Sequence, residues 1–180
     1  MQMLNKGIYI VTGIMASGKS TIAQLLSEQF EQSVHVRGDL FRKMIVKGSI
    51  DMSPDDPQGA AEQLKLRYTI AAKVAEMYYK EGFAVVLQDI YLGKAVHSFL
   101  ESFAAKPLYF ITLNPNVKAI MEREKLRNKT GYSNWEIEPL YNILKNENPK
   151  SGLWIDSSDL TPEETAAEII KRAESEARLA

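Results

Sequence analysis

Eight residues near the start of the chain match the pattern G-x-x-x-x-G-K-[ST], in which the backbone wraps around the phosphates of a nucleotide. The glycines allow close approach to the phosphate oxygens, and the helix that follows adds its positive N-terminal end. The lysine charge meets the β- and γ-phosphates, and the next hydroxyl group binds Mg²⁺. The alternative is a glycine-rich turn that only precedes a helix. The expected nucleotide-binding residues are Gly13, Ile14, Met15, Ala16, Ser17, Gly18, Lys19, Ser20 and Thr21, with Ser20 as a metal ligand.

A short apolar segment, 33–37, leads into the acidic residue Asp39. We expect this strand to neighbour the strand of the phosphate loop, and ligands bind at the carboxyl ends of the strands in such sheets. Asp39 then faces the γ-phosphate, where a carboxylate accepts the proton of an attacking hydroxyl group. Arg42 lies one helical turn further on and is expected either to orient the acceptor or to stabilise charge on the transferred group. The alternative is that Asp39 only caps the next helix and that Arg42 is a surface charge.

Asp89 ends another apolar segment, 83–87, after an intervening glutamine. At the carboxyl end of a strand, its carboxylate is expected to bind Mg²⁺, through water in one arrangement, or to hold the acceptor. The alternative is a residue that caps the turn at the end of the strand.

Basic residues are crowded into segment 118–129. Arg123 and Arg127 share one helix face because they are four residues apart. Phosphoryl transfer spreads negative charge over the transferred group, and a mobile lid that carries arginines neutralises it. We therefore expect a lid at about 123–136. The alternative is a charged helix that only faces solvent.

The elements that must position these residues alternate along the whole chain, since short apolar segments are followed by longer amphipathic ones. This alternation of strands and helices predicts βαβ units and a parallel sheet with helices on both faces. We expect one P-loop NTPase domain over residues 1–180, with five parallel strands in three α/β/α layers. The expected strands are 7–12, 33–37, 83–87, 108–113 and 153–155, and the expected helices are 19–30, 40–47, 60–81, 95–105, 117–127, 137–145 and 161–177.

Composition narrows the possible classes of protein. The 22 basic and 23 acidic residues give a net charge of -1, which supplies no overall attraction to nucleic acid or to an anionic membrane. The absence of cysteine excludes disulfides and thiol nucleophiles. No apolar segment reaches the roughly 18–20 residues of a membrane span, so we expect a cytoplasmic protein. The sequence leaves the oligomeric state open.

Three uses of the phosphate loop compete. A GTPase carries an N-K-x-D element after a strand, which this chain lacks, and a motor ATPase carries Glu where Ile90 follows Asp89. Asp39 favours the third use, transfer of the γ-phosphoryl group of ATP to a hydroxyl group of a small molecule. The expected catalytic residues are Lys19, Asp39, Arg123 and Arg127, and the expected acceptor-binding residues are Asp39, Arg42 and Asp89.

Two alternatives to a small-molecule kinase stay open. One is a polynucleotide 5′-hydroxyl kinase, which needs a basic channel. Asp51, Asp55 and Asp56 place acid near the expected acceptor entrance and disfavour it. The other is a nucleotide-dependent binding module without acceptor chemistry, which would tolerate replacement of Asp39.

Three segments together, 13–21, 37–42 and 85–93, resemble the small P-loop kinases of the zeta-toxin and chloramphenicol phosphotransferase type. Chloramphenicol phosphotransferases also have a strand that runs into Asp, an aromatic residue, Leu and Gly, as in 89–93, and a tail of strand, Asp and small hydroxyl residues, as in 154–158. The resemblance implies Mg-ATP-dependent phosphorylation of a hydroxyl group. It also implies residue roles: Asp39 as general base, Arg123 and Arg127 as lid arginines, and Ser157 and Ser158 near adenine.

The chain departs from that family at two places. Residues 14–17 are not a run of small residues, and the presumed acceptor region, 48–63, matches no family pattern. The resemblance therefore does not identify the acceptor. Asp39 and Arg42 equally resemble the Asp-x-x-Arg stretch of polynucleotide 5′-hydroxyl kinases and adenylylsulfate kinases.

Overall fold

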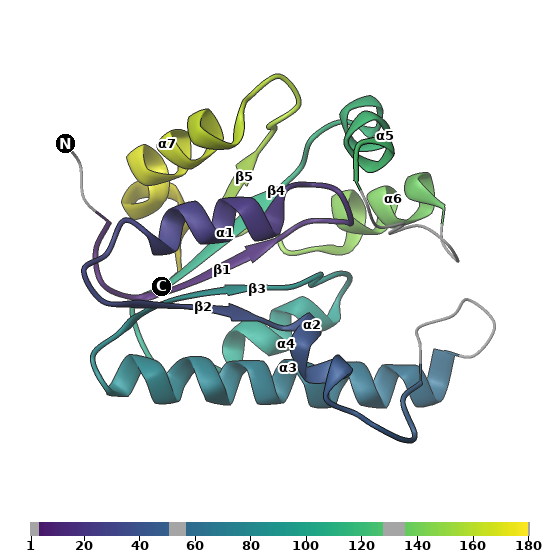
Figure 1. Cartoon of the computed structure of the whole chain (residues 1–180), viewed down its shortest axis with the longest axis horizontal. Helices are drawn as coiled ribbons and strands as arrows, with labels where there is room; N and C mark the ends of the chain where they lie inside the picture. Colours follow the sequence, from purple (N-terminus) through teal and green to yellow (C-terminus); the bar gives the residue numbers. More distant parts are fainter. Residues whose placement is uncertain (1–3, 51–56, 128–135, 180) are drawn as a thin grey trace.

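The computed structural model describes residues 4–50, 57–127 and 136–179 (Figure 1). Five parallel strands form one sheet in the order β2-β3-β1-β4-β5, and the short β6 pairs antiparallel with β4. The strands are β1 (Ile8–Thr12), β2 (Ser33–Arg37), β3 (Ala84–Gln88), β4 (Leu108–Leu113), β5 (Leu153–Ile155) and β6 (Arg178–Leu179). The helices are α1 (Lys19–Ser27), α2 (Asp39–Lys43), α3 (Pro57–Lys80), α4 (Ala95–Glu101), α5 (Val117–Lys125), α6 (Ile137–Glu147), α7 (Pro162–Arg172) and the π-helical turn η1 (Ala173–Ala177).

The order of the strands differs from the expectation in one respect. Strand β3 lies between β1 and β2, and its Gln88 is in register with Val11 on one side and with Arg37 on the other. The prediction that β2 neighbours the strand of the phosphate loop is therefore wrong. Hydrophobic patterning identifies a buried strand but does not encode which strand lies beside it, so the sequence offered no signal for this order.

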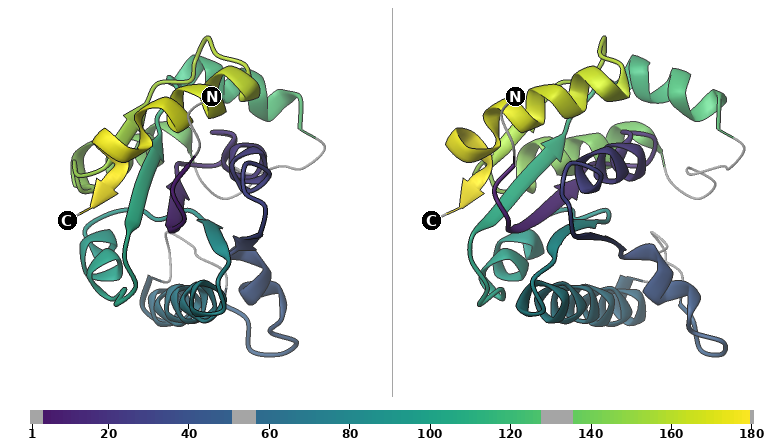
Figure 2. Two further views of the ribbon diagram at one scale, coloured as in Figure 1. Left: turned by 90° about the vertical axis from the view of Figure 1, so that its left-hand side faces the viewer. Right: turned by 60° about the vertical axis from the view of Figure 1, so that its left-hand side comes forward.

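Helices cover both faces of the sheet, as the alternation of elements predicts. In Figure 2, α3 lies on one side of the strands and the yellow α7 on the other. Along β1, Ile8 and Ile10 pack in the core with α3 and α4, whereas Tyr9 and Val11 pack in the core with α1 and α7. Both faces of the strand are buried, which explains its continuous apolar sequence.

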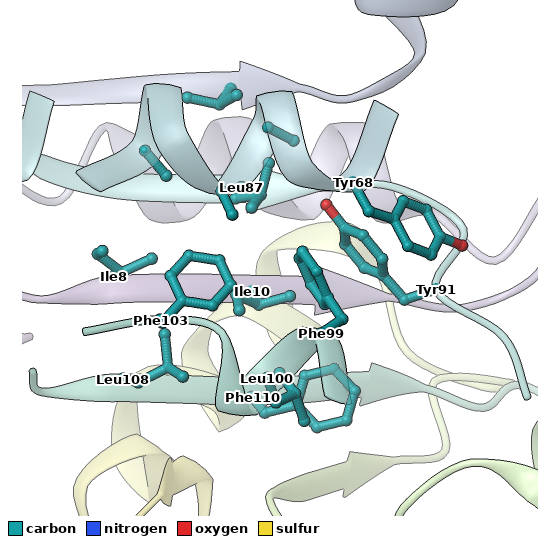
Figure 3. Packing of buried hydrophobic residues seen from close by; sticks show 14 of the residues in the cluster. Ile8, Ile10, Tyr68, Leu87, Tyr91, Phe99, Leu100, Phe103, Leu108 and Phe110 are labelled. Atoms are coloured by element: carbon teal, nitrogen blue, oxygen red, sulfur yellow. The ribbon is translucent and has the colours of Figure 1, made fainter. Parts of the chain in front are cut away.

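The core beneath α3 contains a group of aromatic rings that reaches the end of β3 (Figure 3). The rings of Tyr91 and Phe99 are stacked with centroids 4.4 Å apart, and Tyr68 of α3 lies 4.7 Å from Tyr91. The hydroxyl group of Tyr68 donates to the carbonyl oxygen of Ile90 at 2.6 Å. Helix α3 is thereby fixed to the turn that follows β3.

The last helix begins as the sequence predicts but ends earlier. Thr161 and Glu164 form a reciprocal capping box, and Pro162 occupies the first turn. The α-helix ends at Arg172, and the expected remainder is a π-helical turn that leads into β6. Helix α2 is also shorter than the helix predicted over residues 40–47, since it begins at Asp39 and ends at Lys43.

Some expected features lie outside the described residues. These are the acidic residues Asp51, Asp55 and Asp56 and the part of the expected lid at 128–135. Among the helices that the structure describes, none is both long and apolar enough to cross a membrane.

Candidate active site

The phosphate loop joins the buried strand β1 to helix α1. Lys19 begins α1, is almost fully buried, and donates from Nζ to the carbonyl oxygen of Ile14 at 2.9 Å. A Cβ atom on Gly13 would lie 2.8 Å from the carbonyl oxygen of Leu113, so only glycine fits there. The loop is therefore packed against the end of β4 and closed on itself by the lysine that the sequence motif singles out.

The environment of Lys19 lowers the pKa of its side chain. Burial lowers the pKa of Lys19 to about 8; Asp89 and Asp39 act to raise it, and Arg127 and Arg67 to lower it. These charged groups therefore lie near one another, although they come from separate segments. An ammonium group that is withdrawn from water attracts a phosphate more strongly, because solvent screens the interaction less.

A cleft of about 1230 Å³ opens beside the phosphate loop and the ends of β2 and β3. All the catalytic and acceptor-binding residues expected from the sequence border this cleft, along with Ser157 and the loop residues 15–21. Gly13 and Ile14 are buried and do not border it. Basic side chains outnumber acidic ones seven to two among its described lining residues, although the net charge of the chain is -1. Such a local excess of positive charge is typical of a site for a polyanion. The basic residues are Lys19, Arg37, Arg42, Lys43, Arg67, Arg123 and Arg127.

Asp39 borders this cleft as the first residue of α2. Gly38 is the N-cap, and the Asp39 carboxylate accepts a hydrogen bond from Lys43 Nζ at 2.6 Å instead of capping the helix. Burial acts to raise the pKa of Asp39, but the Lys43 hydrogen bond and the charges of Lys43, Arg67 and Arg37 outweigh it and lower the pKa. The carboxylate is therefore ionised at neutral pH.

Asp89 is buried and held on several sides. Arg67 of α3 donates from Nε to Oδ2 at 2.6 Å and from Nη2 to Oδ1, and Oδ1 also accepts from the backbone N–H of Ile90 at 2.7 Å. The carboxylate packs directly on Gly38, where a Cβ atom would lie 2.7 Å from its Cγ. This ion pair therefore connects α3, the end of β3 and the turn that carries Asp39.

Arg67 is a residue of this site that the sequence patterns did not predict. It lies three residues after Leu64 and directly before Tyr68, within the apolar stripe by which α3 packs on the sheet. Arginine is rarely buried without a partner, so its place in that stripe was a signal for a buried acid nearby. The sequence alone offered no means to choose Asp89 among the acids of the chain.

We expect Gly38→Ala to reduce the free energy of unfolding by about 1–3 kcal/mol, the usual cost of forcing a methyl group into a filled space. The added Cβ atom would press on the Asp89 carboxyl group, which Arg67 holds in place. Urea unfolding measures the loss. Gly59→Ala is the matched control, since its Cβ atom would meet only the flexible end of Ile50 at 3.0 Å. Unfolding curves for Gly38→Ala that match the parent would show that this turn is not fixed against Asp89.

The two candidate lid arginines have different neighbours. Arg123, on α5, donates to the carbonyl oxygen of Ser157, to Ser157 Oγ at 3.3 Å and to the carbonyl oxygen of Ser17 at 3.4 Å. Arg127, just beyond α5, pairs with Glu124 at 3.1 Å and lies near enough to Lys19 to lower its pKa. Arg123 thus links the phosphate loop to the segment after β5, whereas Arg127 lies near Lys19.

The two serines after β5 also differ. Ser157 is buried and borders the cleft. Ser158 Oγ accepts from the backbone N–H of Asn116 at 2.8 Å and donates to Asp156, so it joins this segment to the start of α5. Ser157 therefore lies at the wall of the cleft, where it is bonded to Arg123, and Ser158 supports the surrounding loop.

Residues 12–140 match the model of the AAA domain family (AAA_17), and the chain belongs to this family. The matched segment contains most of the phosphate loop, Asp39, Arg67, Asp89 and both candidate lid arginines. The chain is also similar to a UPF0200 protein of Aeropyrum pernix, with 27% identity over 135 residues, 74% of this chain and 71% of that protein.

Solved structures share the architecture at low sequence identity. An unliganded sugar kinase from Janibacter sp. HTCC2649 is 17% identical, covers 93% of this chain and 94% of its own, and has a TM-score of 0.69. The Deinococcus radiodurans tunicamycin resistance protein is 18% identical, covers 98% and 99%, and has a TM-score of 0.66. The fold is thus the three-layer fold of P-loop kinases, which confirms the predicted fold class. The resemblance to the zeta-toxin and chloramphenicol phosphotransferase subgroup stays a prediction.

Proposed function

We propose that this protein is an ATP-dependent kinase that transfers the γ-phosphoryl group to a hydroxyl group of a small molecule. One observation carries the proposal: Lys19 of the phosphate loop and the ionised carboxylate of Asp39 border the same basic cleft. A carboxylate at this position is able to orient an acceptor hydroxyl group and to accept its proton during transfer to an alcohol. A sugar kinase with the same fold supports the assignment.

In the proposed reaction, the acceptor oxygen forms a bond to the γ-phosphorus while the bond from that phosphorus to the bridging oxygen of ADP breaks. The proton of the acceptor hydroxyl group passes to the Asp39 carboxylate. Lys19 and Arg127 stabilise the charge on the transferred group and on the departing ADP. Because the pKa of Asp39 is low, the carboxylate mainly orients the hydroxyl group and takes its proton late, as a loose transition state allows.

The residues present fit a magnesium ion that arrives with the nucleotide. The Ser20 hydroxyl group is exposed in the cleft directly after Lys19. Arg67 binds both carboxylate oxygens of Asp89, so Asp89 would contact the metal ion through a water molecule. Within the described segments, no group of three acidic or histidine residues could hold a metal ion without the nucleotide. Mg²⁺ bound there would neutralise phosphate charge, with most of its remaining ligands supplied by phosphate and water.

The decisive test is ADP release with Mg-ATP over sugars, nucleosides, hydroxylated antibiotics and 5′-hydroxyl oligonucleotides, followed by mass analysis of the acceptor. We expect one class of small hydroxyl compound to stimulate ADP release and to gain one phosphoryl group. Stimulation by oligonucleotides alone would identify a polynucleotide kinase. Tight ATP binding without phosphorylation of any acceptor would leave a nucleotide-binding module.

The contacts of Arg123 and Arg127 predict a different kinetic defect for the alanine variant of each arginine. Arg127→Ala is expected to lower kcat by about 10²-fold with little change in the KM for ATP, because its charge acts near Lys19 during transfer. Arg123→Ala is expected mainly to raise the KM for ATP, because it loosens Ser157 and the phosphate loop. Steady-state kinetics at saturating acceptor separate the two. The same defect in both variants would contradict this division.

A further inference from the structure

A second, smaller pocket lies beside the basic cleft, between α2 with its following segment and the first half of α3. It has a volume of about 70 Å³ and shares Arg42, Leu64 and Arg67 with the cleft. By the same measure a water molecule needs about 10–15 Å³, so the pocket has room for a group of several heavy atoms. Most of its lining side chains are apolar: Phe41, Ile45, Ile50, Ala60, Leu64, Leu66 and Ile70.

Two of the three polar side chains that line the pocket, Gln63 and Arg67, already form hydrogen bonds with other groups of the protein. Gln63 accepts from the backbone N–H of Ile50 at 2.9 Å and donates to the carbonyl oxygen of Gly48 at 2.6 Å, which holds the segment after α2 against α3. Arg67 is committed to Asp89. A sugar hydroxyl group placed here would lose its water without a matching partner at these two residues, which is unfavourable.

The two segments that form this pocket also carry exposed apolar side chains. The described exposed large hydrophobic residues number nine, and five of them belong to the two segments that form the pocket, 40–50 and 60–70. Val46 is 93% exposed and Met44 is 73% exposed. Exposed apolar side chains that are concentrated in one part of a chain are typical of binding surfaces. The five residues are Leu40, Met44, Val46, Ile50 and Leu66.

The pocket is also connected to the proposed chemistry through α2. Asp39 begins this five-residue helix and borders the cleft, whereas Phe41 and the nearby Ile45 line the pocket. A molecule whose hydroxyl group lies at Asp39 and whose remaining part runs along α2 would therefore meet the pocket.

We infer that the acceptor is a hydroxyl compound with a compact branched-alkyl or aryl group, and that this group occupies the pocket between α2 and α3. The inference rests on the proposed kinase function and narrows its acceptor to alcohols with an apolar substituent, in place of sugars with hydroxyl groups on every carbon.

Three probes with the same two hydroxymethyl groups test this preference: glycerol, 2-isopropyl-1,3-propanediol and 2-phenyl-1,3-propanediol. Their binding to the full chain is measured by ligand-observed NMR with Mg-ADP present, and their phosphorylation by ADP release. We expect the isopropyl and phenyl compounds to bind at least about tenfold more tightly than glycerol, since one well-placed apolar group is worth that much in a fitted pocket. Equal or weaker binding of both would overturn the inference.

Ala60→Leu and Ala61→Leu form a matched pair on α3. Ala60 is buried and lines the pocket, whereas its neighbour Ala61 is exposed and does not. Ala60→Leu is expected to fill the pocket and to abolish the preference for the apolar probes, with the affinity for ATP unchanged. Ala61→Leu is expected to keep the preference. Ile45→Trp fills the same pocket from the other side and replaces Ala60→Leu if that variant does not fold.

The outcomes separate this inference from the proposed function. Apolar probes that bind in the parent and fail to bind in Ala60→Leu support the pocket, even if ADP release finds no acceptor and the kinase proposal fails. An acceptor that is phosphorylated but lacks an apolar group, and that Ala60→Leu handles as the parent does, overturns the pocket while the kinase function stands.

Discussion

Lys19→Ala is expected to lower both the affinity for ATP and the rate of ADP release by about 10²–10³-fold, the usual cost of removing one preorganised charge from a phosphoryl-transfer site. The Lys19 ammonium is nearly buried in a cleft with an excess of basic groups, where water screens its charge poorly. Calorimetric titration with Mg-ATP and steady-state kinetics measure the two losses.

Because Lys19 also bonds to the carbonyl oxygen of Ile14, its removal affects the loop itself. Thermal unfolding of the variant therefore accompanies the titration and separates lost folding from lost binding. Lys94→Ala is the control, since Lys94 is exposed at the start of α4 and does not border the cleft. A folded Lys19→Ala protein that binds ATP as tightly as the parent would refute the assignment of the phosphate loop.

Asp39→Asn is expected to reduce phosphoryl transfer by about 10²–10⁴-fold, the range for loss of a general base, while ATP still binds. The amide keeps the shape of the side chain but does not take the proton of the acceptor hydroxyl group. ADP release at saturating acceptor gives the rate, and titration gives the affinity for ATP. An unimpaired rate would remove the proposed role of Asp39 as the general base.

A second variant tests the same carboxylate through pH. The Lys43 hydrogen bond helps to lower the pKa of Asp39, so Lys43→Met is expected to raise that pKa toward its ordinary value. Since transfer needs the ionised form, the acid limb of kcat/KM then moves to higher pH, with the rate above it little changed. Lys47→Met, in the exposed segment after α2, is the matched control. An unshifted limb in Lys43→Met would show that the rate does not report Asp39.

Local sequence patterns were sufficient to predict most of the strands and the phosphate loop of this protein. The phosphate loop could be predicted because its glycines, Lys19 and Ser20 act within eight consecutive residues, between a strand and a helix. The strands could be predicted because both faces of β1 and β4 are buried, which requires a continuous apolar segment. The capping box of α7 depends on Thr161 and Glu164, three residues apart.

Features that depend on distant parts of the chain could not be predicted in this way. Arg67 meets Asp89 across 22 residues, and Arg123 meets Ser157 across 34. The position of β3 between β1 and β2 is equally a property of the assembled sheet. A pattern read along the chain reports which faces are buried, but it does not report which buried faces meet.

The amino-acid sequence by itself thus determined the class of fold and the phosphate-binding loop, because each depends on patterns among neighbouring residues, whereas the role of Asp39 stays a prediction. Only the tertiary structure decided that Arg67 holds Asp89, that Arg123 and Arg127 have different neighbours, and that an apolar pocket adjoins the cleft. These features arise where α2, α3 and α5 pack around the ends of the strands. Their geometry follows from long-range packing, which local propensity does not specify.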